Sequence, residues 1–146
     1  MIKPIRVKRL QPNAILPTYG TVCAAGADLY ACLDAPVVIQ PGQTVVISTG
    51  VAMEIPDGYV GLVFARSGLA TREGLAPATK VGVIDSDYRG AIQVCLLNHG
   101  QEARTVSPAD RIAQIEITPY ITGVFQEADT LSATERGTGG FGSTGK

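Results

Sequence analysis

The sequence predicts one all-β domain, a sandwich or barrel close to a jelly roll. Three observations predict it: many short runs rich in β-branched residues, turn signals containing Pro or Gly between them, and a length of 146 residues that suits a single domain. Hydrophobic residues make up 45% of the chain, which is enough for a buried core. Apolar patterning fades near residue 126. We therefore expect a core at residues 1–125 and a flexible arm at residues 126–146.

The elements follow from local patterns, taken in chain order. The run IRVKRL alternates apolar and basic residues, as an edge or half-buried strand does. Residues 35–64 contain QPGQ, STG and PDG turns and predict three short strands. ARSGLATREGL, residues 65–75, predicts a short helix, limited by its glycines. VGVIDSDYRGAIQVCLLN, residues 81–98, predicts a hairpin turning near residues 85–90, and RIAQIEITPY, residues 111–120, predicts a further alternating strand.

Composition excludes several classes of function. The net charge is −1, aromatic residues make up 5% and Trp is absent, so no basic or base-stacking surface for nucleic acid is expected. Three cysteines and one histidine lack the paired spacing of a zinc site and indicate reduced thiols. The N-terminal run has no signal-peptide core, and no stretch approaches membrane-spanning length. We expect a soluble cytoplasmic protein that binds neither nucleic acid nor a membrane.

Two early segments carry side chains that suit phosphate or a cation. In AAGADLYA, residues 24–31, we expect Asp28 in a small-residue bend, where it suits a hard cation or simply bonds to local backbone. ARSGLA, residues 65–70, places Arg66, Ser67 and Gly68 after a strand and at the start of the expected helix. A phosphate would suit that position, although a capped helix start with a surface arginine explains the same pattern.

Two later segments add a carboxylate, an aromatic ring and an amide. VGVIDSDYRG, residues 81–90, delivers Asp85 to the end of an apolar strand, with Tyr88 behind it. Asp85 there suits a general base, or an Asx-turn that closes the hairpin. RIAQ, residues 111–114, places Arg111 and Gln114 on a strand, where a solvated strand face is the alternative.

The C-terminal run RGTGGFGSTGK, residues 136–146, has five glycines among eleven residues. Glycine-rich backbone can approach an anion closely, and the guanidinium of Arg136 fits phosphate oxygens. Phe141 suits stacking on a flat ring, whereas a frayed polar terminus is the simpler reading. Together these segments predict a nucleotide-phosphate site assisted by Mg²⁺.

The segments AAGADLYA, ARSGLA, VGVIDSDYRG, RIAQIEI and RGTGGFGSTG, in this order and at these separations, resemble the five motifs of the trimeric dUTPase family. The resemblance implies a distorted jelly-roll, or β-clip, barrel. It also implies that water attacks the α-phosphorus of dUTP with Mg²⁺ present, giving dUMP and pyrophosphate. That reaction keeps uracil out of DNA and supplies dUMP for dTMP synthesis. Family members are homotrimers whose active sites are shared between subunits.

The resemblance also implies a role for each matching residue. Asp85 would activate the water, and Asp28 would bond to a water on Mg²⁺. The base and sugar would contact Thr79, Gly82, Val83, Ile84, Tyr88 and Phe141. The phosphates would contact Arg66, Ser67, Gly68, Gln114, Arg136, Gly139, Gly140, Gly142, Ser143 and Thr144. The arm would then act as a lid over bound substrate.

Two departures and two alternatives accompany this resemblance. Ala65 replaces a common proline, and Thr79 replaces a common asparagine whose amide offers different hydrogen bonds to the base. A dCTP deaminase shares the fold, but Cys95 stands where we would align its catalytic glutamate. A non-catalytic dUTP sensor or protein-binding module on the same scaffold is the other alternative.

Overall fold

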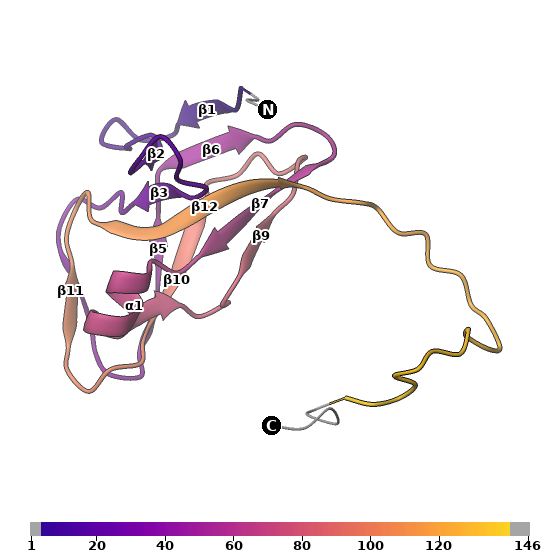
Figure 1. The fold of residues 1–146 in the computed structure, drawn as a ribbon. Helices are drawn as coiled ribbons and strands as arrows, with labels where there is room; N and C mark the ends of the chain where they lie inside the picture. Colours follow the sequence, from indigo (N-terminus) through magenta and orange to yellow (C-terminus); the bar gives the residue numbers. More distant parts are fainter. Residues whose placement is uncertain (1–3, 141–146) are drawn as a thin grey trace.

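The computed structural model describes residues 4–140, and within them it contains twelve strands and one short helix (Figure 1). The elements in chain order are β1 (Arg6–Arg9), β2 (Thr18–Tyr19), β3 (Ala27–Tyr30), β4 (Val37–Ile39), β5 (Thr44–Ser48), β6 (Val51–Glu54), β7 (Tyr59–Phe64), α1 (Ser67–Glu73), β8 (Leu75–Pro77), β9 (Gly82–Ile84), β10 (Gln93–Asn98), β11 (Arg104–Val106) and β12 (Arg111–Pro119). No helix in the described part of the chain has the length and apolar character needed to cross a membrane.

Antiparallel pairing organises the strands into four sheets. The largest has five strands in the order β2-β3-β12-β7-β9, and a second has three in the order β5-β10-β8. Two small sheets, β1-β6 and β11-β4, complete the arrangement. The prediction of a jelly-roll-like all-β domain is confirmed.

The core lies between these sheets because the strands alternate buried and less buried positions. In β3, Ala27 and Leu29 are buried while Asp28 and Tyr30 are partly exposed. In β10, Val94, Leu96 and Asn98 are buried. The core is almost entirely aliphatic, and the long side chains that are fully buried include Leu29, Ile39, Ile47, Ile55, Leu75, Ile92, Leu96 and Ile112.

The prediction of three strands in residues 35–64 is wrong, because the structure has four, β4 to β7. The three turns in this stretch separate four extended segments, and each segment pairs with a different partner strand.

The predicted hairpin over residues 81–98 is also wrong. Its two strands form as expected, but β9 pairs with β7, whereas β10 pairs with β5 and β8. The chain therefore crosses from one sheet to another between Asp85 and Gln93. The loop that carries Asp85 and Tyr88 lies at this crossing.

Helix α1 confirms the short helix expected after β7. It ends at Glu73 and is capped by Gly74, whose φ of 70° lies in the left-handed region that favours glycine. A side chain at Gly74 would also meet the backbone of Gly100, so this glycine is required for space as well as for backbone conformation. The turn fixes α1 beside β8, at one end of β7.

After Pro119 the chain leaves the domain as an extended arm, and the described part of it contains no helix or strand (Figure 1). Large apolar side chains on it are almost fully exposed: Ile121, Val124, Phe125 and Leu131. The division at residue 125 and the flexibility of the arm remain predictions.

Candidate active site

A row of side chains crosses the five-stranded sheet on the face away from the core. Asp28 of β3 lies opposite Gln114 of β12, and Gln114 lies opposite Phe64 of β7. Directly opposed residues in antiparallel strands project to the same face. Asp28 therefore belongs to a strand and not to the bend that the small residues around it indicate.

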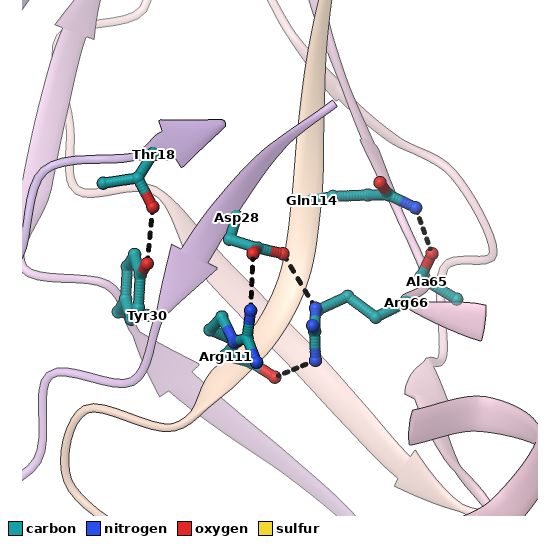
Figure 2. A network of polar contacts seen from close by, with 7 residues as sticks. All are labelled: Thr18, Asp28, Tyr30, Ala65, Arg66, Arg111 and Gln114. Atoms are coloured by element: carbon teal, nitrogen blue, oxygen red, sulfur yellow. Dashed lines mark hydrogen bonds and ion pairs between the residues drawn. The ribbon is translucent and has the colours of Figure 1, made fainter. Parts of the chain in front are cut away.

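Asp28 is held between two arginines (Figure 2). Arg66 donates from Nε to Oδ1 at 2.8 Å, and Arg111 donates from Nη1 to Oδ2 at 3.3 Å. Arg66 also donates from Nη1 to the carbonyl oxygen of Arg111 at 3.4 Å. The Asp28 side chain is only 14% exposed, so this contact is less screened than an ordinary surface ion pair. The network fixes two cations beside one largely shielded carboxylate.

Gln114 of β12 is positioned by residues near Arg66 and Asp28. Its Nε2 donates to the carbonyl oxygen of Ala65 at 2.8 Å, one residue before Arg66 (Figure 2). Gly26 leaves room for the amide, because a Cβ at that position would lie 2.5 Å from Oε1 of Gln114. Asp28, Arg66, Arg111 and Gln114 thus form one polar cluster, which we call the arginine cluster.

Ser67 and Gly68 begin α1 directly after this cluster. Arg66 precedes the helix in an extended conformation and provides no side-chain cap. The alternative of a side-chain-capped helix start is therefore not observed. The hydroxyl of Ser67 is on an exposed residue, and the guanidinium of Arg72 lies over Gly68.

A second group of candidate residues surrounds a cavity of about 260 Å³ at the end of β9. Val83, Ile84, Asp85, Tyr88, Ala91 and Gln93 line it. Asp85 is exposed, and its carboxylate accepts no hydrogen bond from any residue in 4–140. The Asx-turn alternative therefore does not hold, and the carboxylate is available to a water molecule or a ligand.

The loop around Asp85 is braced by its own residues. Tyr88 donates from its amide to the carbonyl oxygen of Asp85 at 3.2 Å, and from its hydroxyl to that of Ala91 at 3.0 Å. Arg89 donates from Nη1 to the carbonyl oxygen of Ser86 at 2.6 Å. These contacts hold the Tyr88 ring as one wall of the cavity beside Asp85.

The turn before β9 carries Thr79, which is exposed. Its carbonyl oxygen accepts from the amide of Val81 at 2.7 Å, and its neighbour Lys80 has a φ of 63°. Gly82 lies opposite Val63 of β7, and a Cβ on Gly82 would come within 3.3 Å of the Val63 side chain. Glycine therefore suits the close packing of β9 on β7.

One chain does not bring the arginine cluster and Asp85 together. Ile84 lies opposite Gly61 near the start of β7, so Asp85 leaves the sheet at that end. Arg66 follows the other end of β7. The five residue steps of extended chain from Gly61 to Arg66 span roughly 17 Å. This separation is too long for both groups to contact the same phosphorus atom.

The predicted arm residues that the structure describes form their hydrogen bonds within the arm. Arg136 donates from Nε to the carbonyl oxygen of Gly139 at 2.8 Å, in a turn of the arm itself. Gly140 is exposed, with no atom near the position of its missing Cβ. The remaining predicted arm residues, Phe141, Gly142, Ser143 and Thr144, lie outside the described residues.

Sequence reasoning assigned no site role to Arg111, Ala91 or Gln93. Arg111 is predicted on a strand, with a solvated strand face as the alternative, but in the structure it binds Asp28. Ala91 and Gln93 line the cavity because the chain turns back past Tyr88. The local sequence shows only that Arg111 lies three residues before Gln114. Its partner Asp28 is 83 residues away in the chain, so the sequence does not reveal the contact.

The fold and these groups define a class of β-rich proteins with a cationic, phosphate-compatible cluster and a separate carboxylate-lined cavity. A sequence model of the dUTPase family matches residues 12–145. The chain belongs to the dUTPase family.

Relatives and solved structures agree with this assignment. The deoxyuridine 5'-triphosphate nucleotidohydrolase of Syntrophotalea carbinolica is 48% identical over 97% of this chain and 96% of its own. The enzyme of the same name from Desulfitobacterium hafniense is 56% identical over 89% of this chain and 87% of its own. The dUTPase of Staphylococcus bacteriophage 80alpha, solved with dUPNHPP, superposes with a TM-score of 0.92 at 29% identity and covers 99% of this chain and 100% of its own.

Proposed function

We propose that this chain hydrolyses dUTP to dUMP and pyrophosphate by attack of water on the α-phosphorus. The observation that carries the proposal is the match to the dUTPase family across residues 12–145, which includes both the arginine cluster and the Asp85 cavity. Relatives covered over most of their length carry the name deoxyuridine 5'-triphosphate nucleotidohydrolase.

Asp85 is the general base of this proposal. Its carboxylate is exposed, faces the cavity and is not engaged by another side chain of residues 4–140. An unpaired carboxylate can accept a proton from water as the water attacks. Tyr88 would pack against the deoxyribose, and the backbone from Thr79 to Ile84 would contact the uracil edge.

The arginine cluster and the arm hold the triphosphate. Arg66 and Gln114 supply donors, Ser67 and Gly68 follow at the start of α1, and Asp28 keeps the guanidinium of Arg66 in place. Phosphoryl transfer depends mainly on positioning and charge neutralisation. The arm would add Arg136, Gly139, Gly140, Gly142, Ser143 and Thr144 to the phosphates and Phe141 to the base.

Magnesium fits this site only together with the substrate phosphates. Residues 4–140 contain no cluster of three His, Cys, Asp or Glu side chains that could hold the ion alone. Asp28 has lone pairs left on its two oxygens, so it would bond to a Mg²⁺-bound water. The ion would neutralise charge on the phosphate oxygens when bound. A phage phi11 dUTPase structure with a TM-score of 0.80 is described as containing a structural Mg(II) ion.

The roughly 17 Å of extended chain from Gly61 to Arg66 supports a site shared between copies of the chain. A homotrimer would place the Asp85 cavity of one copy beside the arginine cluster of another, with the arm of a third across them. The apolar side chains exposed along the arm are consistent with packing on a partner.

Pyrophosphate release from dUTP, dCTP, dTTP and UTP, measured side by side with Mg²⁺, tests the proposal. We expect rapid release from dUTP alone. If dUTP binds but is not hydrolysed, the chain is a dUTP sensor and the proposed activity is wrong. Hydrolysis of all four nucleotides would instead contradict the roles of Tyr88 and of residues 79–84.

A further inference from the structure

The Tyr88 ring lies directly over Gly90. A Cβ built on Gly90 would lie 2.5 Å from Cζ and 2.9 Å from Cε2 of the ring, and closer still to the hydroxyl oxygen. Carbon atoms that are not bonded to each other do not approach so closely. The ring can therefore occupy its observed position only because residue 90 has no side chain.

Gly90 supplies space and not backbone freedom. The glycines of residues 4–140 with positive φ are Gly42, Gly50, Gly58, Gly74 and Gly137, and Gly90 is not among them. Alanine is thus compatible with the backbone of residue 90. Alanine would instead fill the space between residue 90 and the Tyr88 ring.

The same ring is held at its far end and forms part of the cavity. Its hydroxyl donates to the carbonyl oxygen of Ala91 at 3.0 Å, and the residue is 44% exposed. One edge of the ring therefore lies against the backbone of residues 90 and 91, while Tyr88 and Asp85 line the same cavity. Any displacement of the ring changes the shape of that cavity.

We propose that Gly90 is a positioning residue. By letting the Tyr88 ring lie against the backbone of residues 90 and 91, it fixes the distance between the ring and the sugar and so enforces the exclusion of a ribose 2'-hydroxyl. The proposal rests on the proposed function, in which Tyr88 packs against the deoxyribose. With Gly90, the ring is fixed low against the backbone at one defined distance from the sugar. A methyl group at residue 90 pushes the ring outward, breaks its bond to Ala91 and removes the fixed limit on the space left for the sugar.

This change affects specificity more than stability. The atoms that a new Cβ meets are at the far end of a side chain that is exposed to solvent on one side, so the ring can swing outward. The core is not involved. Recognition of a sugar by steric contact depends on small changes in the position of the contacting ring. We therefore expect discrimination between dUTP and UTP to be lost while the protein still folds.

The test compares Gly90→Ala with Gly20→Ala, which makes the same chemical change where a Cβ meets no atom within 4 Å. The measured quantity is kcat/KM for dUTP divided by that for UTP. We expect this ratio to fall at least about tenfold in Gly90→Ala and to stay unchanged in Gly20→Ala. A ratio that is unchanged in Gly90→Ala would overturn the proposal.

A double variant separates the ring from the backbone. In a Tyr88→Ala background the atoms that clash with residue 90 are absent, so adding Gly90→Ala should have no further effect on the ratio. An equal loss in both backgrounds would mean that Gly90 acts through the backbone. If Gly90→Ala fails to fold while the double variant folds, the ring has no space into which it can move, and the proposal is wrong.

A crystal structure of Gly90→Ala distinguishes this proposal from the proposed function, because it needs no turnover. We expect the ring to be displaced and its hydrogen bond to Ala91 lost. A ring that stays in place with this bond intact overturns the role of Gly90, whatever the enzyme hydrolyses. If the ring is displaced in Gly90→Ala but the wild-type protein does not hydrolyse dUTP, Gly90 remains a positioning residue and the proposed function is wrong.

Discussion

Asp28 shows how one residue can position two cations, one of which the proposed function assigns to phosphate binding. It is a nearly buried carboxylate whose two oxygens accept hydrogen bonds from Arg66 and Arg111. The two guanidinium groups compensate its charge, and Asp28 in turn restricts their orientation. If Arg66 binds phosphate as proposed, its guanidinium is already ordered by Asp28 before substrate binds.

Asp28→Asn should weaken substrate binding more than turnover. The amide keeps one acceptor oxygen but places an NH₂ group against a guanidinium, so one arginine loses its anchor. We expect the affinity for the imido analogue dUPNHPP to fall about tenfold, measured by calorimetry. Glu54→Gln is the matched control, because its partner Arg6 is an exposed residue and their ion pair contributes little. Equal losses in both variants would show that the effect is one of overall charge.

Asp85→Asn should leave dUTP binding largely intact and reduce turnover about a thousandfold or more. A neutral amide has the same shape but cannot accept the proton of the attacking water. Single-turnover kinetics with dUTP would measure the loss. Asp87→Asn, an exposed neighbour in the same loop, should remain near the wild-type rate. A kcat for Asp85→Asn comparable to that of the wild type would remove Asp85 from the role of general base.

At the scale of elements, local pattern predicts β1, β9, β10 and β12, but it does not predict β2, β3, β8 or β11, and it does not say which strands pair. Alternation and turn residues predict β9 and β10, but nothing local says that they join different sheets. Asp28 follows AAGA, a run typical of a bend, and pairing with β12 overrides that preference. Arg111 reaches Asp28 only through the same long-range pairing. Motif residues could therefore be found from the sequence, and the network that links them could not.

Asn98 is the clearest case of an element fixed by a buried polar group. It is fully buried at the end of β10, donates to the carbonyl oxygens of Ile39 and Glu102 at 2.9 and 2.7 Å, and accepts from Gly100 at 2.9 Å. It thus ties β4 and the following loop to β10.

Asn98→Ala should lower the free energy of unfolding by roughly 3 kcal/mol, because it leaves buried backbone groups without partners. Denaturant titration would measure this loss. His99→Ala, at the exposed neighbouring residue, should change stability by less than about 0.5 kcal/mol. A similarly small loss in Asn98→Ala would mean that water replaces the amide without cost.

At the scale of the whole molecule, the domain is complete but the candidate site is divided. The core, the arginine cluster and the cavity are all formed by residues 4–119, while residues 120–140 contain no strand or helix. In the proposed function the arm closes over the site and adds nothing to the core, so removal of residues 136–146 should leave the assembly intact and abolish efficient hydrolysis. Light scattering and pyrophosphate release would report the two properties separately. A truncated protein with full activity would show that the arm is not a lid.

The most direct test of a dUTP site shared between copies is complementation between two inactive chains. Asp85→Asn and a chain truncated after Glu135, co-expressed with different tags and purified through both, should form mixed assemblies that release pyrophosphate from dUTP. Such assemblies would combine the intact Asp85 of one chain with the intact arm of another. Mixed assemblies no more active than either parent would contradict a site built from several copies.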